Sequence, residues 1–266
     1  TRTLGLEAAG AWNVGVKMFT LLSQVIWSVP RMSAPAFSEM IVRQEQARLR
    51  ERYQMLFVLT LSLSAFAAVS LALCNSLFVP ILSHHKFGWP PGNDLLLGIW
   101  MMIMAVVHCH NSFVLLTKKI RRMSYVYFAE GIVFVVSALL VAPYGGLPAV
   151  IGTSIVCSIF FSGAYGVWRI SDYFHLSVRE VAFRWLIPMG KVLLVFALLA
   201  LVAWFASQKV AGLPMRLMIN LAFCGTIGFY LFLRFGISSS FQMELLGRAP
   251  KPARPVLRRI FASPTT

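Results

Sequence analysis

The sequence predicts an all-α, polytopic membrane protein. Hydrophobic residues make up 58% of its 266 residues, whereas charged residues make up only 12%, about half the share usual in a soluble domain. The mean hydropathy is +0.75. So few charges cannot cover the surface of a water-soluble globule of this length. The apolar residues also occur in runs long enough to cross a bilayer as helices.

The charges are strongly unbalanced, with 24 Lys and Arg against 9 Asp and Glu and a formal net charge of +15. A basic balance can indicate nucleic-acid binding, which requires basic residues on an aqueous face. Here the cations lie mainly between long apolar segments instead. No nucleic-acid partner is therefore expected, and the cations are interpreted as signals of membrane topology.

Seven apolar segments have about the 20 residues that a helix needs to cross a hydrocarbon core of about 30 Å. The second segment is over-long and holds Asn75 and Pro80, which predict a kink or an interfacial end. The seven form a transmembrane helical bundle over residues 1–233, followed by a basic cytoplasmic tail over 234–266. The spans are predicted at 9–30, 55–82, 95–116, 123–142, 147–168, 186–206 and 213–233.

The cations predict the orientation, because cytoplasmic connections are enriched in Lys and Arg. Of the 24 cations, 18 fall in alternate connections and in the tail, and 4 fall on the opposite side. The N-terminus of this chain is thus predicted outside and its C-terminus in the cytoplasm. The chain begins at Thr1, almost inside a helix, so we expect further transmembrane helices upstream.

A stripe of polar residues runs along one side of the first span. Its members are spaced by three or four and lie within about 80° of one another around a helix. A Lys facing lipid near the bilayer centre costs about 2.5–3.5 kcal/mol on insertion scales, so the stripe is expected to line a cavity. Alternatively, its end cations snorkel to the interfaces and its neutral residues bond to neighbouring helices. The stripe comprises Asn13, Lys17, Thr20, Gln24, Ser28 and Arg31.

Glu130 is the only carboxylate that the sequence places well inside a span. An intramembrane acid is a functional candidate, so Glu130 is interpreted as a charge partner of Lys17 or as a coupling site for protons or sodium. Equally, it can lie close to the cytoplasmic headgroups. His108-Cys109-His110 resembles a ligand cluster, but on a helix the two histidines point about 200° apart. No metal site is predicted there, and no cofactor is expected.

The segments outside the spans point to lipid contact. Residues 37–52 form a pattern typical of one amphipathic, mixed-charge helix lying along the headgroups. The tail combines prolines with basic residues, so it is expected to be mobile and attracted to anionic membrane lipids. The chain has no Gly-rich phosphate loop and no paired aspartates for Mg²⁺. An enzymatic function is therefore not expected.

Three stretches resemble a known family. Residues 4–12 lead through a long helix to residues 29–39. They are similar to a helix of the polysaccharide flippases in the multidrug/oligosaccharidyl-lipid/polysaccharide exporter superfamily, in which a G-x-(Y/W) motif outside leads to a P-x-(F/L)-S motif inside. Residues 146–153 resemble the start of a later helix in each half of these proteins, although Pro148-Ala149 replaces the usual Gly-Ala. The spacing of the connections fits across essentially the whole chain.

The resemblance implies that the chain is the C-terminal bundle of a transporter with about 12 to 14 helices. It implies alternating access that moves a polyprenyl-diphosphate-linked glycan across the bacterial cytoplasmic membrane, with Lys17 lining a cationic cavity. One alternative is an integral-membrane glycan polymerase or acyltransferase, which the short outer loops and the near-absence of acids in the spans disfavour. Another is a drug exporter or a non-catalytic subunit of the same fold.

Overall fold

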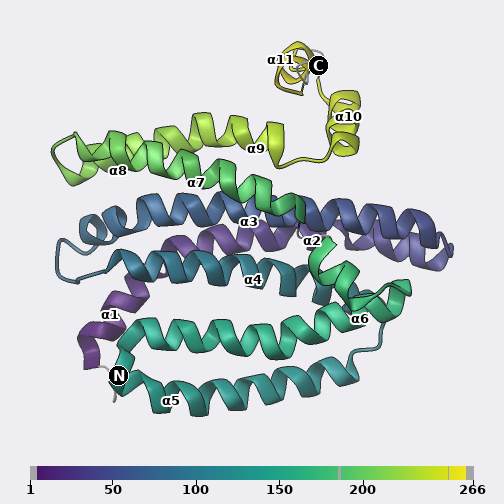
Figure 1. The fold of residues 1–266 in the computed structure, drawn as a ribbon, viewed down its shortest axis with the longest axis horizontal. Helices are drawn as coiled ribbons and strands as arrows, with labels where there is room; N and C mark the ends of the chain where they lie inside the picture. Colours follow the sequence, from purple (N-terminus) through teal and green to yellow (C-terminus); the bar gives the residue numbers. More distant parts are fainter. Residues whose placement is uncertain (1–4, 185–186, 251, 262–266) are drawn as a thin grey trace.

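The computed structural model describes residues 5–184, 187–250 and 252–261, and every regular element in these ranges is a helix (Figure 1). The predicted all-α fold is confirmed. The elements, with three π-helical turns labelled η, are α1 (Gly5–Gly15), α2 (Lys17–Val42), α3 (Gln46–Leu82), α4 (Pro91–Leu116), α5 (Arg121–Ser158), η1 (Ile159–Gly163), α6 (Ala164–Phe174), η2 (Glu180–Arg184), α7 (Ile187–Gln208), α8 (Leu213–Phe223), η3 (Cys224–Gly228), α9 (Phe229–Phe235), α10 (Ser239–Arg248) and α11 (Arg254–Phe261).

Five helical segments in the described ranges are long and apolar enough to cross a membrane, which is compatible with a multi-pass membrane protein. Large apolar side chains such as Phe128, Leu140 and Leu201 are exposed on their outer surfaces, as lipid-facing residues are. Helix α2, which carries most of the polar stripe, is not among the five, and the number of seven spans stays a prediction. The five are Gln46–Leu82, Pro91–Leu116, Arg121–Phe174, Gly190–Gln208 and Leu213–Phe235.

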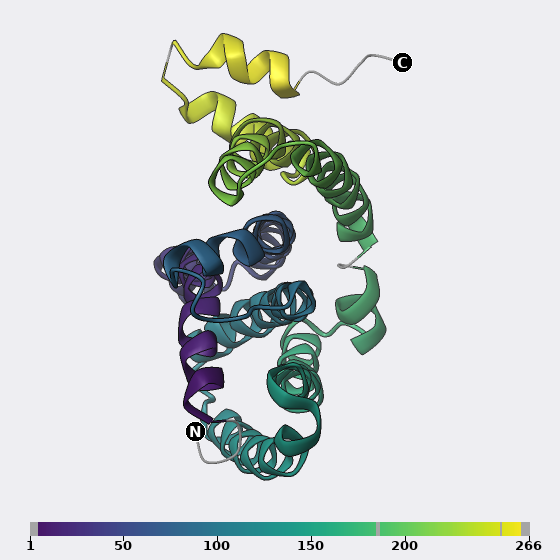
Figure 2. The same cartoon turned by 90° about the vertical axis from the view of Figure 1, so that its left-hand side faces the viewer.

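The third of these segments folds back on itself. Gly146 has φ 59° and ψ −148°, a conformation open to glycine, and it interrupts the helical path inside α5. The chain therefore forms two antiparallel arms, one before Gly146 and one continuing through η1 into α6 (Figures 1 and 2). The two arms cover the predicted spans 123–142 and 147–168.

Helix α3 lies at the centre of the fold. It contacts α2 and α4 on one side and α7 and α8 on the other (Figures 1 and 2). Its side chains are buried all around the helix rather than along one stripe; Leu61, Ala65 and Leu71 are among them. An all-round apolar helix of this kind is expected only where neighbours surround it.

The long helices lie side by side, and their connections gather at two ends of the bundle. The turn between α3 and α4 and the reversal at Gly146 lie at one end, whereas the connections 43–45 and 117–120 lie at the other (Figure 1). Helix α10 lies at that second end as well. The cation-rich connections thus share an end, as the topology prediction requires, while their placement in the cytoplasm stays a prediction.

The first predicted span is not one straight helix. Helix α1 ends at Gly15 and α2 begins at Lys17, with a turn at Val16 between them. The indole ring of Trp89 fills the space beside Gly15, where a Cβ would meet ring atoms at 2.2–2.5 Å. Helix α2 then continues to Val42, beyond the predicted boundary at 30, with Pro30 and Pro35 inside it.

One prediction outside the spans differs from the structure. Residues 37–52 do not form a single surface helix, because Gln44 adopts a left-handed conformation (φ 57°) and the chain turns from α2 into α3 there. The tail contains the helices α10 and α11, and its mobility stays a prediction. Its residues 251 and 262–266 lie outside the described ranges.

The contact between Gly15 and Trp89 predicts a position that tolerates no side chain. Gly15→Ala is expected to destabilise the protein by about 1–3 kcal/mol, because the buried indole must shift to admit a methyl group. Gly152→Ala is the matched control, since nothing lies within 4 Å of a Cβ placed there. It is expected to be neutral or stabilising by up to about 1 kcal/mol. Thermal unfolding in detergent measures both, and equal melting temperatures for the two variants would contradict the prediction.

Candidate functional site

The polar stripe is divided between two helices and faces outward. Asn13 lies on α1, and the other members lie on α2. Thr20 donates its hydroxyl group to the backbone carbonyl of Val16, in the turn before α2, and Ser28 donates to that of Val25. Among the described residues, no ion pair involves Lys17 or Arg31. Exposed members are Asn13, Lys17, Thr20, Gln24 and Arg31, and Ser28 is half-buried.

The opposite side of α2 holds the helix in the bundle. Phe19, Ile26 and Phe37 are buried there, and α2 contacts both α3 and α4. The ring of Phe19 stacks on Trp100 of α4 with centroids 5.0 Å apart, and Trp27 stacks on His108 at 4.1 Å. Packing therefore fixes which side of α2 is free, and that side carries the stripe.

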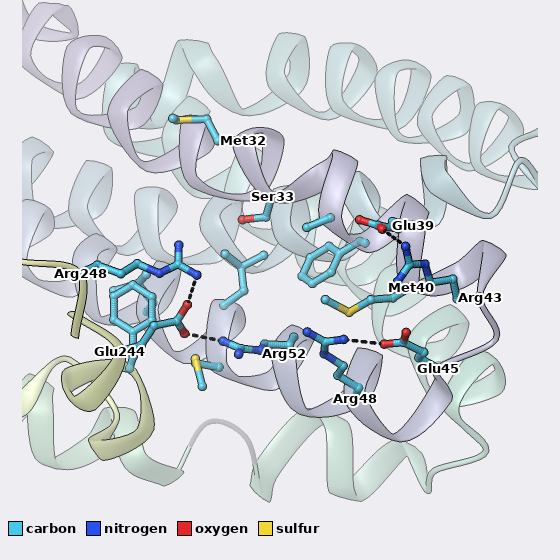
Figure 3. Close-up of a pocket in the computed structure, with 16 residues that line it drawn as sticks. Met32, Ser33, Glu39, Met40, Arg43, Glu45, Arg48, Arg52, Glu244 and Arg248 are labelled. Atoms are coloured by element: carbon cyan, nitrogen blue, oxygen red, sulfur yellow. Dashed lines mark hydrogen bonds and ion pairs between the residues drawn. The ribbon is translucent and has the colours of Figure 1, made fainter. Parts of the chain in front are cut away.

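A pocket of about 490 Å³ opens at the end of α2, between α2, α3 and α10 (Figure 3). It adjoins the stripe, since Ser28, Met32 and Ala36 follow one another at a spacing of four, and the last two line the pocket. Its walls combine apolar side chains with arginines and glutamates. They include Met32, Met40, Met55, Leu56, Phe241, Arg43, Arg48, Arg52, Arg248, Glu39, Glu45 and Glu244.

Ion pairs order the charged side of this pocket. Arg43 pairs with Glu39 at 2.7 Å, and Arg48 with Glu45 at 2.8 Å, and the partners are three or four positions apart in the chain (Figure 3). These two pairs set a charged rim close to the turn from α2 into α3. They are exposed, so each contributes little to stability.

Glu244 of α10 joins the tail to α3. Its carboxylate accepts hydrogen bonds from Arg52 at 2.5 Å and pairs with Arg248 at 2.7 Å. The hydrogen bond from Arg52 lowers the pKa of Glu244 below its ordinary value, and the charges of Arg52 and Arg248 act in the same direction. With four arginines and three glutamates on its walls, the pocket keeps an excess of positive charge.

Glu130 lies between the two arms of the hairpin. Its carboxylate accepts hydrogen bonds from the hydroxyl of Ser158 at 3.1 Å and from the backbone N–H of Ser162 at 3.2 Å. Ser162 belongs to the π-helical turn η1, and π-turns recur at functional sites. The described residues include no ion pair between Lys17 and Glu130. The roles of Glu130 as a charge partner of Lys17 or as a coupling site stay predictions.

The two histidines of the motif in α4 face different helices. His108 stacks on Trp27 of α2, whereas Nδ1 of His110 lies 2.6 Å from the hydroxyl of Tyr53 of α3. The ring of His110 also stacks on Phe57. Both rings thus hold α4 against its neighbours, and the motif does not gather its side chains at one point.

Sequence reasoning missed the contact between Arg52 and Glu244. The two residues are 192 positions apart, and each belongs to a mixed-charge segment in which several pairings are equally plausible from spacing. It also missed the carboxyl group of Asp94, which is fully buried, because Asp94 precedes the predicted span 95–116 by one residue.

Comparisons of the chain with protein-family models, with curated proteins and with solved structures find no match. The family resemblance of its motifs therefore remains an expectation from the sequence.

The contact through Glu244 predicts a pH-dependent attachment of α10. A carboxyl group whose pKa is lowered on folding stabilises the fold above its ordinary pKa of about 4.3 and loses this effect as the pH falls through the lowered value. Glu244→Gln is expected to raise amide hydrogen exchange in α10 several-fold at neutral pH, as acidification does in the wild type. Glu51→Gln changes an exposed glutamate of α3 and serves as the control. Unchanged exchange in Glu244→Gln would show that this contact does not hold α10.

Proposed function

We propose that the protein is part of a membrane transporter that moves lipid-linked oligosaccharide or polysaccharide precursors across the bacterial cytoplasmic membrane by alternating access. One observation carries the proposal: the exposed side of α2 carries the polar stripe, beside exposed apolar side chains such as Leu21 and Val25, whereas aromatic and aliphatic side chains pack on the opposite side. Substrate binding is assigned to Asn13, Lys17, Thr20, Gln24 and Arg31.

The cost of exposing this side to lipid supports the proposal. A single Lys at the bilayer centre costs about 2.5–3.5 kcal/mol on insertion scales, and uncharged polar groups on the same face add to this cost. A helix held in a bundle with this side free is stable when water, a substrate or another polar surface covers the side. A transport cavity supplies such a cover.

The pocket at the end of α2 adds a second line of support. Its arginines offer hydrogen-bond donors of the geometry that phosphate oxygens prefer, and its methionine and phenylalanine side chains offer an apolar wall. This combination suits an amphiphile with a phosphorylated head and an isoprenoid chain. A volume of about 490 Å³ fits such a head group rather than a whole glycan.

Two other functions compete with the proposed one. An integral-membrane glycan polymerase or acyltransferase needs a cluster of acid, base or nucleophile groups at its reacting centre, which a transporter does not need. A drug exporter of the same fold shares the cavity but needs no phosphate recognition. Accumulation of lipid-linked repeat units on the inner leaflet of a deletion strain separates the flippase from both.

The stripe predicts that Lys17 is required for transport. In a deletion strain complemented with variants, Lys17→Ala is expected to lower the export of lipid-linked repeat units by about tenfold or more, equivalent to about 1.4 kcal/mol. Lys17→Glu is expected to lower it further, because it repels a phosphorylated substrate. Lys209→Ala is the control, since Lys209 is an exposed lysine between α7 and α8. Wild-type export by both Lys17 variants, at equal membrane abundance, would refute the proposal.

A further inference from the structure

A buried aspartate lies where α1, α3 and α4 meet. Asp94 Oδ1 accepts hydrogen bonds from Nδ2 of Asn75 in α3 and from the indole N–H of Trp89, each at 2.6 Å. The same nitrogen of Asn75 donates to the backbone carbonyl of Gly15 at 2.9 Å. Asp94 and Asn75 are both 0% exposed. This cluster therefore ties the break between α1 and α2 to two other helices.

Two oxygen atoms of the cluster lack a donor. Asp94 Oδ2 and Asn75 Oδ1 are buried and have no hydrogen-bond partner among the residues described. The Asn75 amide cannot be turned over to relieve this, because its nitrogen already donates to two acceptors, Gly15 O and Asp94 Oδ1. An ionised Asp94 would thus keep one carboxylate oxygen without a hydrogen-bond donor, in a cluster that also buries the unpaired amide oxygen of Asn75. Burial makes such an arrangement unfavourable.

No cation compensates for a charge on Asp94: within the described part of the chain it forms no ion pair. The titratable side chain beside it is the thiol of Cys74 in α3. The N-terminus of α4 favours a negative charge, but by less than the cost of burying an unpaired one. The titratable groups on α1, at the start of α2 and in the turn between α3 and α4 are exposed: Glu7, Lys17, His84, His85 and Lys86. Tyr53, Cys109 and His110 are buried on α3 and α4, but they lie toward the other end of these helices.

We propose that Asp94 is a proton-binding site, with the proton held on the carboxyl group in this fold. The neutral acid carries no buried charge and supplies an O–H donor where two acceptors stand unpaired. Its Oδ1 remains the acceptor for Asn75 and Trp89. The ligand is a proton rather than a hard metal ion, because only two oxygens of the cluster are free and such ions take about six or more oxygen ligands.

The site lies directly behind one end of the polar stripe. Asn13 and Lys17 flank Gly15, whose carbonyl is bound by Asn75. Loss of the proton places a negative charge in the cluster. This weakens the attachment of the turn between α1 and α2 to α3 and α4, and so frees the end of α2 that carries Lys17. The proton site stands on the cluster alone, so it holds or fails independently of the transport function.

Thermal unfolding of the purified chain in detergent, from about pH 5 to about pH 8, tests the proposal. Because the folded protein binds this proton more tightly than the unfolded chain, its stability is expected to fall as the pH rises. Asp94→Asn mimics the neutral acid and is expected to remove the loss of stability with rising pH that is due to Asp94. Asp172→Asn changes the other aspartate of the chain, an exposed partner of Arg169, and is expected to keep the wild-type profile.

Infrared spectroscopy gives a second readout that needs no folded Asp94 variant. A protonated carboxyl band is expected in the wild type at about pH 5.5, above the ordinary pKa of Asp and Glu side chains, and it is expected to persist in Glu130→Gln. Absence of this band, or an Asp94→Asn profile that falls with pH as the wild type does, overturns the proposal. A sodium-dependent rise of the wild-type melting temperature that Asp94→Asn loses also overturns it, because the ligand is then a metal cation.

Discussion

Helix α3 is surrounded by α2, α4, α7 and α8, and this enclosure buries polar side chains such as Tyr53, Thr60 and Asn75. Thr60 and Ser64 donate their hydroxyls to carbonyls of the same helix, which lets them stay buried at little cost. Tyr53 and Asn75 cannot do so, and each reaches a polar partner on α4 instead. The need to satisfy buried polar groups thus fixes how α4 lies along α3.

These two polar contacts lie at opposite ends of the same pair of helices. Near one end, Tyr53 meets His110 within an aromatic cluster that includes Phe57 and Phe113. Near the other end, Asn75 meets Asp94 and the carbonyl of Gly15. Directional bonds at both ends prevent the apolar surfaces between them from sliding, since dispersion and burial by themselves are not directional.

The arrangement leaves one side of α2 without a neighbour. That side carries the polar stripe and, at its end, the arginine-rich pocket. Both features follow from the same constraint, because the apolar side of α2 is already used against α3 and α4. The pocket is closed on its third side by α10, which an ion pair with Arg52 holds in place. A tail segment therefore contributes to a surface that the spans alone do not complete.

Part of the candidate site could be predicted from local pattern. The spacing of Asn13, Lys17 and Gln24 places them on one helix face whatever the surroundings are. The hydrogen bonds of Glu130 could not be predicted, because they depend on a reversal at Gly146 and on a π-turn that frees a backbone N–H. The burial of Asp94 could not be predicted either, because it depends on where the turn after α3 packs against α1.

The sequence by itself determined the all-α class, the positions of most long helices and the segregation of the cations. These features depend on the types of residues in each segment and on their spacing along the chain, which can be read without knowing any distant contact. Only the tertiary structure decided which face of α2 is free, which residues line the pocket beside Arg52, and that Asp94 is buried. Those facts depend on contacts between distant segments, and such contacts are fixed by packing and by the pairing of buried polar groups rather than by local spacing.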